Sequence, residues 1–437
     1  MSLDIPDAIR QQAQDLLDFI DASPSPWHAV QTASQRLQAA GFCPLNEVDR
    51  WSLRAGGRYY VTRGGSSLIA FVVGEAPLAE QGLCLVGAHT DSPGLRLKPR
   101  PADSVGGVVR LGVEVYGGPI LATFADRDLS LAGRVVLRDA HGQRTALVNF
   151  GDALLRLPNL AIHMNREVND KGLKFNKQTE LPLLLGALPA GLTAADAFRQ
   201  PLAAQLDVDP ASLLTWELAA FDTQKGAFWG VDREYLANSQ LDNLASCHAA
   251  LSALIASPDD TGSRLLALFD HEEVGSDSAV GAGGSFLGDV LQRLSSGQGL
   301  DDEDRQRMLA RSLFISADMA HAWHPNFPAA YEPCHTLAVN AGPVIKNNAN
   351  QRYSTDAETA ARFMACCERA GVPCQQYAHR TDLGCGSTIG PILAARLGVP
   401  SVDVGSPMWA MHSVRESAGV LDHGYLIAAL GAAFAGR

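Results

Sequence analysis

The stretch GLCLVGAHTDSP, residues 82–93, carries the pattern on which the fold assignment rests. It is a short apolar run that ends in polar residues, as expected for a buried parallel strand and the loop at its carboxyl end. Three later segments repeat this pattern: RLLALFDHEEVGS (264–276), SLFISADMAHA (312–322) and PSVDVGSPMWAMHS (400–413). Helical patterns lie between them, so we predict an α/β domain with helices on both faces of a mixed, mostly parallel sheet.

The helical patterns differ clearly from the strand-like runs. LDNLASCHAALSALIAS (241–257) places its large apolar residues on one face, and DAETAARFMACCERAG (356–371) ends at a glycine that Pro373 follows closely. The N-terminal residues 1–23 also have apolar side chains near helical spacing. We predict a helix in each of these segments, and we expect 241–257 and 356–371 to be among the helices that cover the sheet.

The middle of the chain has a pattern of β-hairpins instead. The segment 108–118 alternates valine and leucine with other residues, and 134–148 is typical of two strands around a turn at 139–142. The segment 215–222 is a further strand candidate. We therefore predict a β-rich domain inserted into the α/β domain, which divides the chain into residues 1–93, 94–233 and 234–437.

Composition excludes several classes of protein. The chain has 437 residues with 35 basic and 47 acidic side chains, a net charge of −12, and no run rich in Lys or Arg, which argues against binding nucleic acid or an anionic membrane. Its longest nearly apolar run, residues 181–192, is too short to cross a bilayer, and the N-terminus does not resemble a signal peptide. Eight cysteines without a C-x-x-C pair suggest reduced thiols, so we expect a cytoplasmic protein.

Residue types that bind metals follow each of the four strand-like runs. In an open α/β sheet such residues converge, because ligands bind beyond the carboxyl ends of the strands. Histidine and carboxylate ligands without cysteine favour a catalytic site for zinc, manganese or cobalt. The candidates are His89 and Asp91 after the first run, 270–273 after the second, Asp318, His321 and His324 after the third, His412 after the fourth, and Asp242 at the start of a helix.

The spacing inside two of these motifs also fits a metal site. Residues two apart on an extended chain share a side, so Asp91 can hold the second ring nitrogen of His89. Of Glu272 and Glu273, one can bind metal while the other acts as general base, and a carboxylate that bridges two ions would bring them to about 3.5–4 Å apart. Each residue alone has an ordinary explanation as a loop or surface side chain, so the prediction depends on the whole set.

Seven motifs occur in an order that resembles a known family. They are GAHTDSPG, SQLDNLAS, FDHEEVGS, SADMAHAWHPN, KNNANQRY, CGSTIGP and MHSVRE, and LPNLAIHMNREVN (157–169) adds to them. Together they resemble the aspartyl aminopeptidase family of dinuclear zinc aminopeptidases, to which the vacuolar aminopeptidases are related. The resemblance implies an inserted dimerisation domain, a tetrahedral dodecamer, and removal of N-terminal residues, often Asp or Glu, from peptides.

The same resemblance implies roles for individual residues. His89, Asp242 and Asp318 match the ligands of one metal ion; Asp242, Glu273 and His412 match those of the second, with Asp242 bridging. Glu272 matches the general base, and Asp91 matches the aspartate that holds the histidine ligand. The resemblance thus implies two divalent ions per subunit, most simply Zn²⁺, with Mn²⁺ or Co²⁺ as alternatives.

Three further positions concern the substrate. His163 matches a histidine of the inserted domain that either binds metal or, as we favour, reaches the active site of a neighbouring subunit. Lys346 matches a lysine for the acidic side chain of the substrate, and Arg352 is our second candidate for that role. Gln240 departs from the family pattern, which often has Arg before LDNL.

Other classes of enzyme fit less well. The chain lacks the G-x-S-x-G turn of serine hydrolases and the G-x-x-x-x-G-K-[ST] loop of nucleotide-binding proteins. A related dizinc hydrolase with a neutral preference, a carboxypeptidase or an N-acyl amino acid deacylase remains the alternative. A non-catalytic relative is disfavoured, because both Glu272 and Glu273 are present.

Overall fold

The computed structural model describes residues 4–140, 142–258 and 262–436, which form two compact units. The first unit comprises residues 1–91, 226–411 and 416–437, and the second comprises residues 92–225 and 412–415. The expected turn at 139–142 includes His141, which lies outside the described residues.

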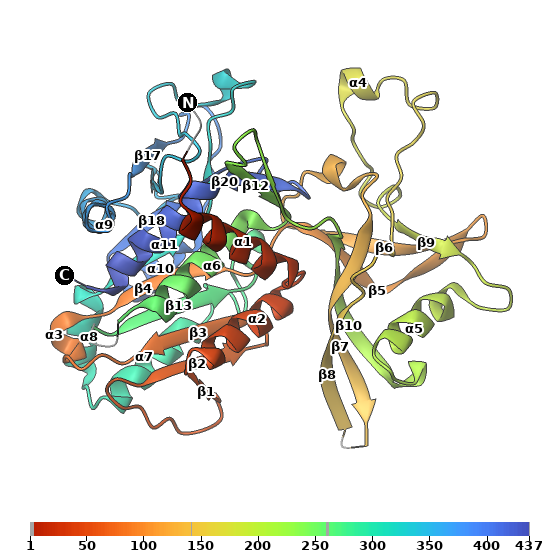
Figure 1. Cartoon of the computed structure of the whole chain (residues 1–437). Helices are drawn as coiled ribbons and strands as arrows, with labels where there is room; N and C mark the ends of the chain where they lie inside the picture. Colours follow the sequence, from red (N-terminus) through yellow and green to blue (C-terminus); the bar gives the residue numbers. More distant parts are fainter. Residues whose placement is uncertain (1–3, 141, 259–261, 437) are drawn as a thin grey trace. The chain divides into compact units, whose positions relative to one another are not determined.

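A nine-stranded sheet forms the centre of the first unit, and five of its eight neighbouring strand pairs are parallel. The predicted mixed, mostly parallel sheet is confirmed. Figure 1 shows how segments distant in sequence mix in it, with green β13 between the orange strands β3 and β4. In spatial order the strands are β1 (Cys43–Leu45), β2 (Arg58–Arg63), β3 (Ser67–Val72), β13 (Arg264–Phe269), β4 (Cys84–His89), β14 (Leu313–Ala317), β18 (Ser401–Gly405), β16 (Val344–Asn347) and β17 (Gln375–Ala378).

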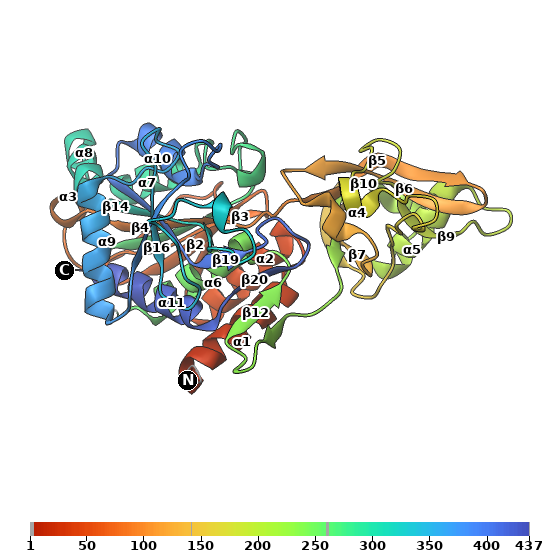
Figure 2. The same ribbon diagram turned by 90° about the horizontal axis from the view of Figure 1, so that it is seen from above.

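Helices cover both faces of this sheet, as expected. The central strands are buried on both faces, so alternate residues enter two different cores: Val86 joins one and Leu85 the other. Figure 2 shows α7, α8 and α10 along one side of the strands and α1, α6 and α11 along the other. The first core contains α1 (Asp7–Asp21), α2 (Pro26–Ala39), α6 (Leu241–Ala256), α9 (Ala357–Ala370) and α11 (Val420–Phe434), and the second contains α3 (Leu78–Gln81), α7 (Phe286–Gly297), α8 (Asp302–Arg311) and α10 (Ile389–Leu397).

A small five-stranded sheet completes the first unit. Its strands in order are β11 (Ala227–Trp229), β12 (Tyr235–Asn238), β20 (Glu416–Gly419), β19 (Pro407–Trp409) and β15 (Ala320–His321). Two short 3-10 helices, η3 (Glu272–Val274) and η4 (Pro328–Ala330), lie in loops of the same unit.

The second unit is β-rich and has its own core. Its six-stranded sheet is antiparallel throughout, with Leu95, Leu111 and Leu131 among the buried residues. The strands in order are β8 (Gly142–Asn149), β7 (Leu129–Asp139), β10 (Leu213–Asp222), β5 (Gly94–Val105), β6 (Val108–Tyr116) and β9 (Leu183–Ala187), accompanied by α4 (Val168–Lys171), α5 (Ala194–Gln205), η1 (Leu121–Phe124) and η2 (Pro210–Ser212).

None of the helices in the described part of the chain has the length and apolar character that a bilayer span requires.

Candidate metal centre

Three adjacent strands deliver the acidic side chains to one end of the main sheet. β4 ends at His89, which pairs with Phe269, the last residue of β13. The segment 270–273 therefore leaves the sheet beside His89, and Asp318 leaves it directly after β14, on the other side of β4. Because the three strands are parallel, their carboxyl ends lie at the same edge.

Asp242 reaches the same place from the start of α6. Its backbone N–H donates to Glu416 Oε2 at 2.9 Å, and the side chain of the next residue, Asn243, donates to the carbonyl oxygen of Ala317 at 2.8 Å. This second bond ties the helix start to the end of β14, next to Asp318. Asn243 was not predicted from the sequence, where its only signal was its position beside Asp242. Gln240 precedes the helix in a left-handed conformation, with φ of 58°.

The distances around His89 fit a shared cation better than direct hydrogen bonds. His89 Nε2 lies 3.5 Å from Asp242 Oδ1, 3.8 Å from Asp318 Oδ2 and 4.0 Å from Glu272 Oε2. Two ligands that are each about 2.1 Å from a tetrahedral zinc ion are about 3.4 Å apart. One ligand atom from each of His89, Asp242 and Asp318 lies within 4.8 Å of the others, and the same holds for His89, Glu272 and Glu273.

The electrostatics of the cluster also favour a bound cation. Burial raises the pKa of Glu272 to about 8, against the opposing effect of His89. Burial raises the pKa of Asp318 as well, although the ammonium group of Lys346 acts against it. Burial lowers the pKa of His89, but the carboxylates beside it outweigh burial and leave this pKa well above its usual value. Crowded, buried carboxylates retain protons unless cations replace them, so the donor set suits divalent ions.

Asp91 holds two parts of the cluster together. The Nδ1 atom of His89 lies 3.0 Å from the main-chain oxygen of Asp91 and 3.4 Å from its carboxylate. The same carboxylate accepts the backbone N–H groups of Glu272 at 3.2 Å and Glu273 at 3.1 Å. Asp91 is fully buried, so it orients His89 and fixes the turn that carries both glutamates. The spacing in sequence predicted only the first of these contacts.

Lys346 lies beside the cluster, whereas Arg352 makes other contacts. The buried Nζ of Lys346 donates to the carbonyl oxygen of Met319 at 3.0 Å and lies 3.6 Å from Asp318 Oδ1. It also lies 5.1 Å from the centre of the Tyr353 ring. The Nε of Arg352 donates to the carbonyl oxygen of Cys385 at 3.2 Å.

His163 and His412 belong to the second unit. His163 is exposed in a loop whose apolar neighbours Leu160 and Met164 are exposed by 62% and 74%. The Nδ1 atom of His412 lies 3.1 Å from the carbonyl oxygen of Gly118 in the same unit.

Two other histidines near the strand ends have different surroundings. His321 packs edge-on against the Tyr377 ring, with centroids 6.2 Å apart, and the Nδ1 of His324 accepts the backbone N–H of Asn326 at 3.2 Å. Over residues 4–140, 142–258 and 262–436, neither belongs to a group of side chains with metal-ligand spacing.

Comparison with known proteins gives a match over nearly the whole chain. A family model described as "Aminopeptidase I zinc metalloprotease (M18)" matches residues 19–434. The "Probable M18 family aminopeptidase 2" of Ectopseudomonas mendocina (strain ymp) is 49% identical over 421 residues, or 95% of this chain and 96% of that protein. The protein of the same name from Stutzerimonas stutzeri (strain A1501) is 50% identical over 424 residues, or 96% of this chain and 97% of that protein.

Solved structures give the same result. A chain in the cryo-EM structure of the Ape4 and Nbr1 complex is 37% identical and superposes with a TM-score of 0.94, covering 99% of this chain and 87% of that one. The chain in the crystal structure of prApe1 is 28% identical and superposes with a TM-score of 0.92; the match covers 98% of this chain and 94% of that one. The chain in the structure of the S. cerevisiae mApe1 dodecamer is 28% identical and superposes with a TM-score of 0.84; the match covers 96% of this chain and 95% of that one.

Proposed function

The chain belongs to the M18 family of zinc aminopeptidases, and we propose that it removes N-terminal aspartate or glutamate residues from peptides. The observation that carries this proposal is the convergence of His89, Asp242 and Asp318 with the carboxylates of Glu272 and Glu273 at one edge of the main sheet. This set supports the hydrolytic chemistry, and a buried ammonium group beside it supports the acidic preference.

We assign two divalent ions to this edge, most simply zinc, with manganese or cobalt as alternatives. The ligands of the first ion are His89, Asp242 and Asp318, and those of the second are Asp242, Glu273 and His412. When bound, the ions supply Lewis acidity at the scissile carbonyl group and lower the pKa of the attacking water. The protein contributes the buried donor atoms and the contacts of Asp91 that keep them in place.

Glu272 is the general base in this proposal. Its carboxylate lies at the cluster, and its backbone is held by Asp91. Burial raises the pKa of this carboxyl group to about 8, which favours proton uptake near neutral pH, and bound cations would lower that value. Glu272 thus takes a proton from the attacking water and passes it to the leaving amine.

Lys346 is the proposed recognition group for an acidic side chain. Its ammonium group has three N–H donors, of which one is directed to Met319, so donors remain for a substrate carboxylate. The proximity of Lys346 to Asp318 favours the second candidate function, an aminopeptidase with a neutral preference, because Asp318 already offsets part of the lysine charge. Arg352 is the reserve candidate for recognition.

The proposal includes self-association and a cytoplasmic location. The exposed loop around His163 and the antiparallel sheet of the second unit suit a contact between two subunits, in which His163 acts in its neighbour's active site rather than as a metal ligand. A mApe1 relative forms a dodecamer, and we propose the same assembly here.

The first experiment measures hydrolysis of Asp, Glu, Ala and Leu p-nitroanilides after chelation and after return of Zn²⁺, Mn²⁺ or Co²⁺. We expect chelation to abolish activity, one of the ions to restore it, and the acidic substrates to have the highest kcat/KM. Activity that survives complete metal removal would contradict the metal assignment, and faster hydrolysis of the leucine substrate would support the neutral preference.

The second experiment tests Lys346 directly. Lys346→Met should lower kcat/KM for the Asp and Glu substrates at least about tenfold, since losing one partner of a desolvated charge pair costs typically about 2–5 kcal/mol. The kcat/KM values for the Ala and Leu substrates should change little, and Arg352→Met should change kcat/KM only slightly for every substrate. An equal loss for all substrates, with lower metal content, would mean that Lys346 acts by holding Asp318.

A further inference from the structure

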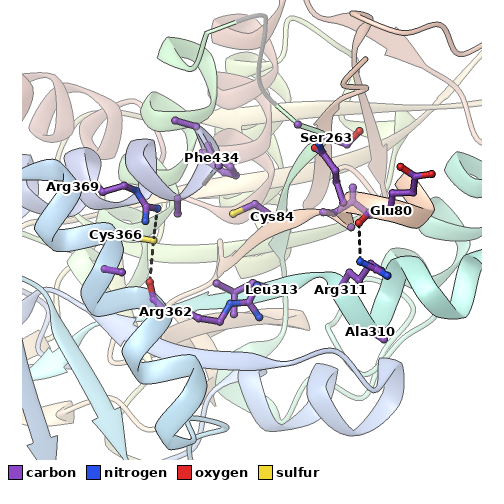
Figure 3. Close-up of a pocket in the computed structure, with 18 residues that line it drawn as sticks. Glu80, Cys84, Ser263, Ala310, Arg311, Leu313, Arg362, Cys366, Arg369 and Phe434 are labelled. Atoms are coloured by element: carbon purple, nitrogen blue, oxygen red, sulfur yellow. Dashed lines mark hydrogen bonds between the residues drawn. The ribbon is translucent and has the colours of Figure 1, made fainter. Parts of the chain in front are cut away.

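A cavity lies at the opposite end of the strands that carry the metal ligands (Figure 3). Cys84 and Leu313, the first residues of β4 and β14, line it, as does Ser263, which directly precedes β13. Its walls come from α9 and from the ends of α3, α8 and α11. Its volume is about 930 Å³, which is within the usual range for small-molecule sites.

Three arginines face this cavity: Arg311, Arg362 and Arg369. Glu80 is the single acidic residue among the described residues that line it. The described lining is therefore more basic than the chain as a whole, which has 47 acidic and 35 basic side chains. Some exposed arginines have carboxylate partners, as in Arg307–Asp304, and others, such as Arg50 and Arg144, have none among the described residues; the three cavity arginines form no ion pair with any residue in 4–140, 142–258 or 262–436.

The positions of two of the three arginines are explained by hydrogen bonds at helix ends. Arg311 is the last residue of α8 and donates to the carbonyl oxygen of Glu80 at 3.1 Å, and Arg369, in the last turn of α9, donates to that of Ala432 at 3.2 Å. Cations at such positions offset the partial negative charge of helix carboxyl ends. Arg362 lies in the middle of α9, so this explanation does not extend to it.

The rest of the wall mixes polar and small apolar residues. Leu313 and Phe434 are almost fully covered, at 7% and 1% exposed, so the apolar surface open to the cavity includes the half-buried Ala365 and the exposed Ala310 and Ala435. A guanidinium group has five N–H donors in a planar fork that matches carboxylate and phosphate oxygens. Arg369 also donates to Cys366 Sγ at 3.3 Å, and both Arg311 and Arg369 have N–H donors beyond the bonds described, so the cavity combines guanidinium donors with small apolar side chains.

We propose that this cavity binds a small organic anion with a phosphate or carboxylate head and an apolar body. The head group contacts Arg362, with Arg311 and Arg369 as additional donors, and the body packs on the alanine side chains of the wall, Ala310, Ala365 and Ala435. The cavity is separate from the metal centre, because β4, β13 and β14 begin at the cavity and end at the metal ligands.

The test is isothermal titration calorimetry of the metal-loaded protein with phenyl phosphate, benzoate and phenol. We expect one site per subunit for at least one of the two anions and at least tenfold weaker binding of phenol; comparison of the anions identifies the preferred head group. Arg362→Ala and, separately, Arg369→Ala should each weaken anion binding at least about tenfold, or 1.4 kcal/mol. Aminopeptidase activity of Arg362→Ala should stay at the wild-type level.

The control is Arg307→Ala, which removes one positive charge from α8, the helix that also carries Arg311, at a position paired with Asp304 and outside the lining of the cavity. This variant should bind the anions with an affinity within twofold of the wild-type value. Failure of both anions to bind, equal affinity in the wild type and both cavity variants, or binding that depends on the metal ions and not on Arg362 would each overturn the proposal. Arg362→Gln replaces the alanine variant if circular dichroism shows that the latter does not fold.

Discussion

Glu272 is the residue on which the proposed chemistry depends most directly. Glu272→Gln keeps the size of the side chain but removes its ability to accept a proton, so kcat should fall about 10²–10⁴-fold. The metal content, measured by mass spectrometry of the purified enzyme, should stay near that of the wild type, because Glu272 is not among the assigned ligands.

The control for this variant is Glu303→Gln on the exposed first turn of α8, which should keep normal turnover. Wild-type turnover in Glu272→Gln would reject the role of general base. Loss of metal in that variant would instead assign Glu272 to the ligands.

At the scale of elements, the turn that carries Glu272 is attached to the loop that follows it. His271, at φ of 65°, precedes the turn, and its Nδ1 lies 2.8 Å from Ser278 Oγ. The same hydroxyl oxygen accepts the backbone N–H of Gly281 at 2.9 Å, so the hydroxyl hydrogen is available to His271. The contact between His271 and Ser278 therefore attaches the glycine-rich loop 278–284 to the turn that carries Glu272, the proposed general base.

We predict that Ser278→Ala lowers kcat several-fold while KM and metal content stay near normal, since the turn loses a support but no ligand. His271→Ala should lower kcat further than Ser278→Ala does, because alanine tolerates positive φ poorly. His271→Asn should recover much of the activity, because asparagine adopts positive φ more readily. Ser296→Ala on the exposed side of α7 is the control. Equal activity in Ser278→Ala and the wild type would show that the loop does not position Glu272.

At the scale of the whole molecule, acid should destabilise the first unit through buried histidines. Burial lowers the pKa of His28 to about 4, and it also lowers the pKa values of His248 and His423. An unfolded histidine has a pKa of about 6.5. The folded state therefore binds fewer protons below that pH, and the stability that neutral His28 contributes is complete above about pH 6.5 and is lost as the pH falls towards 4.

This loss can be measured by urea unfolding of the chelated protein at pH 7.5 and pH 4.5. Over that interval, wild type should lose about 2 kcal/mol more stability than His28→Gln, whose side chain does not titrate. An equal loss in the two proteins would mean that His28 is already protonated when folded or is accessible to water.

Assembly is the other property of the whole molecule, and it is tested by mixing subunits. If His163 acts in a neighbouring active site, oligomers reassembled from Glu272→Gln and His163→Phe subunits contain some complete sites, and activity rises above that of either parent. The control mixes each variant with itself. Absence of recovery in confirmed mixed oligomers would place His163 in its own subunit's site or in a structural role.

The sequence by itself determined the class of the fold and most of the candidate ligands. Apolar runs that end in polar residues are a local consequence of burying a strand on both faces, so β4, β13, β14 and β18 were predicted from their own residues. Since the carboxyl ends of parallel strands meet at one edge, the order of the residues alone was enough to group His89, Asp318 and the 270–273 segment.

Only the tertiary structure decided which distant groups touch. The carboxylate of Asp91 binds the backbone of Glu272 and Glu273, and Lys346 lies beside Asp318. The arginine-lined cavity likewise joins segments from residue 80 to residue 436. Periodicity in the sequence indicates whether a side chain is buried, but it does not indicate which other residue that side chain contacts. Partners follow from strand order and helix packing, which depend on the shapes of all the elements together.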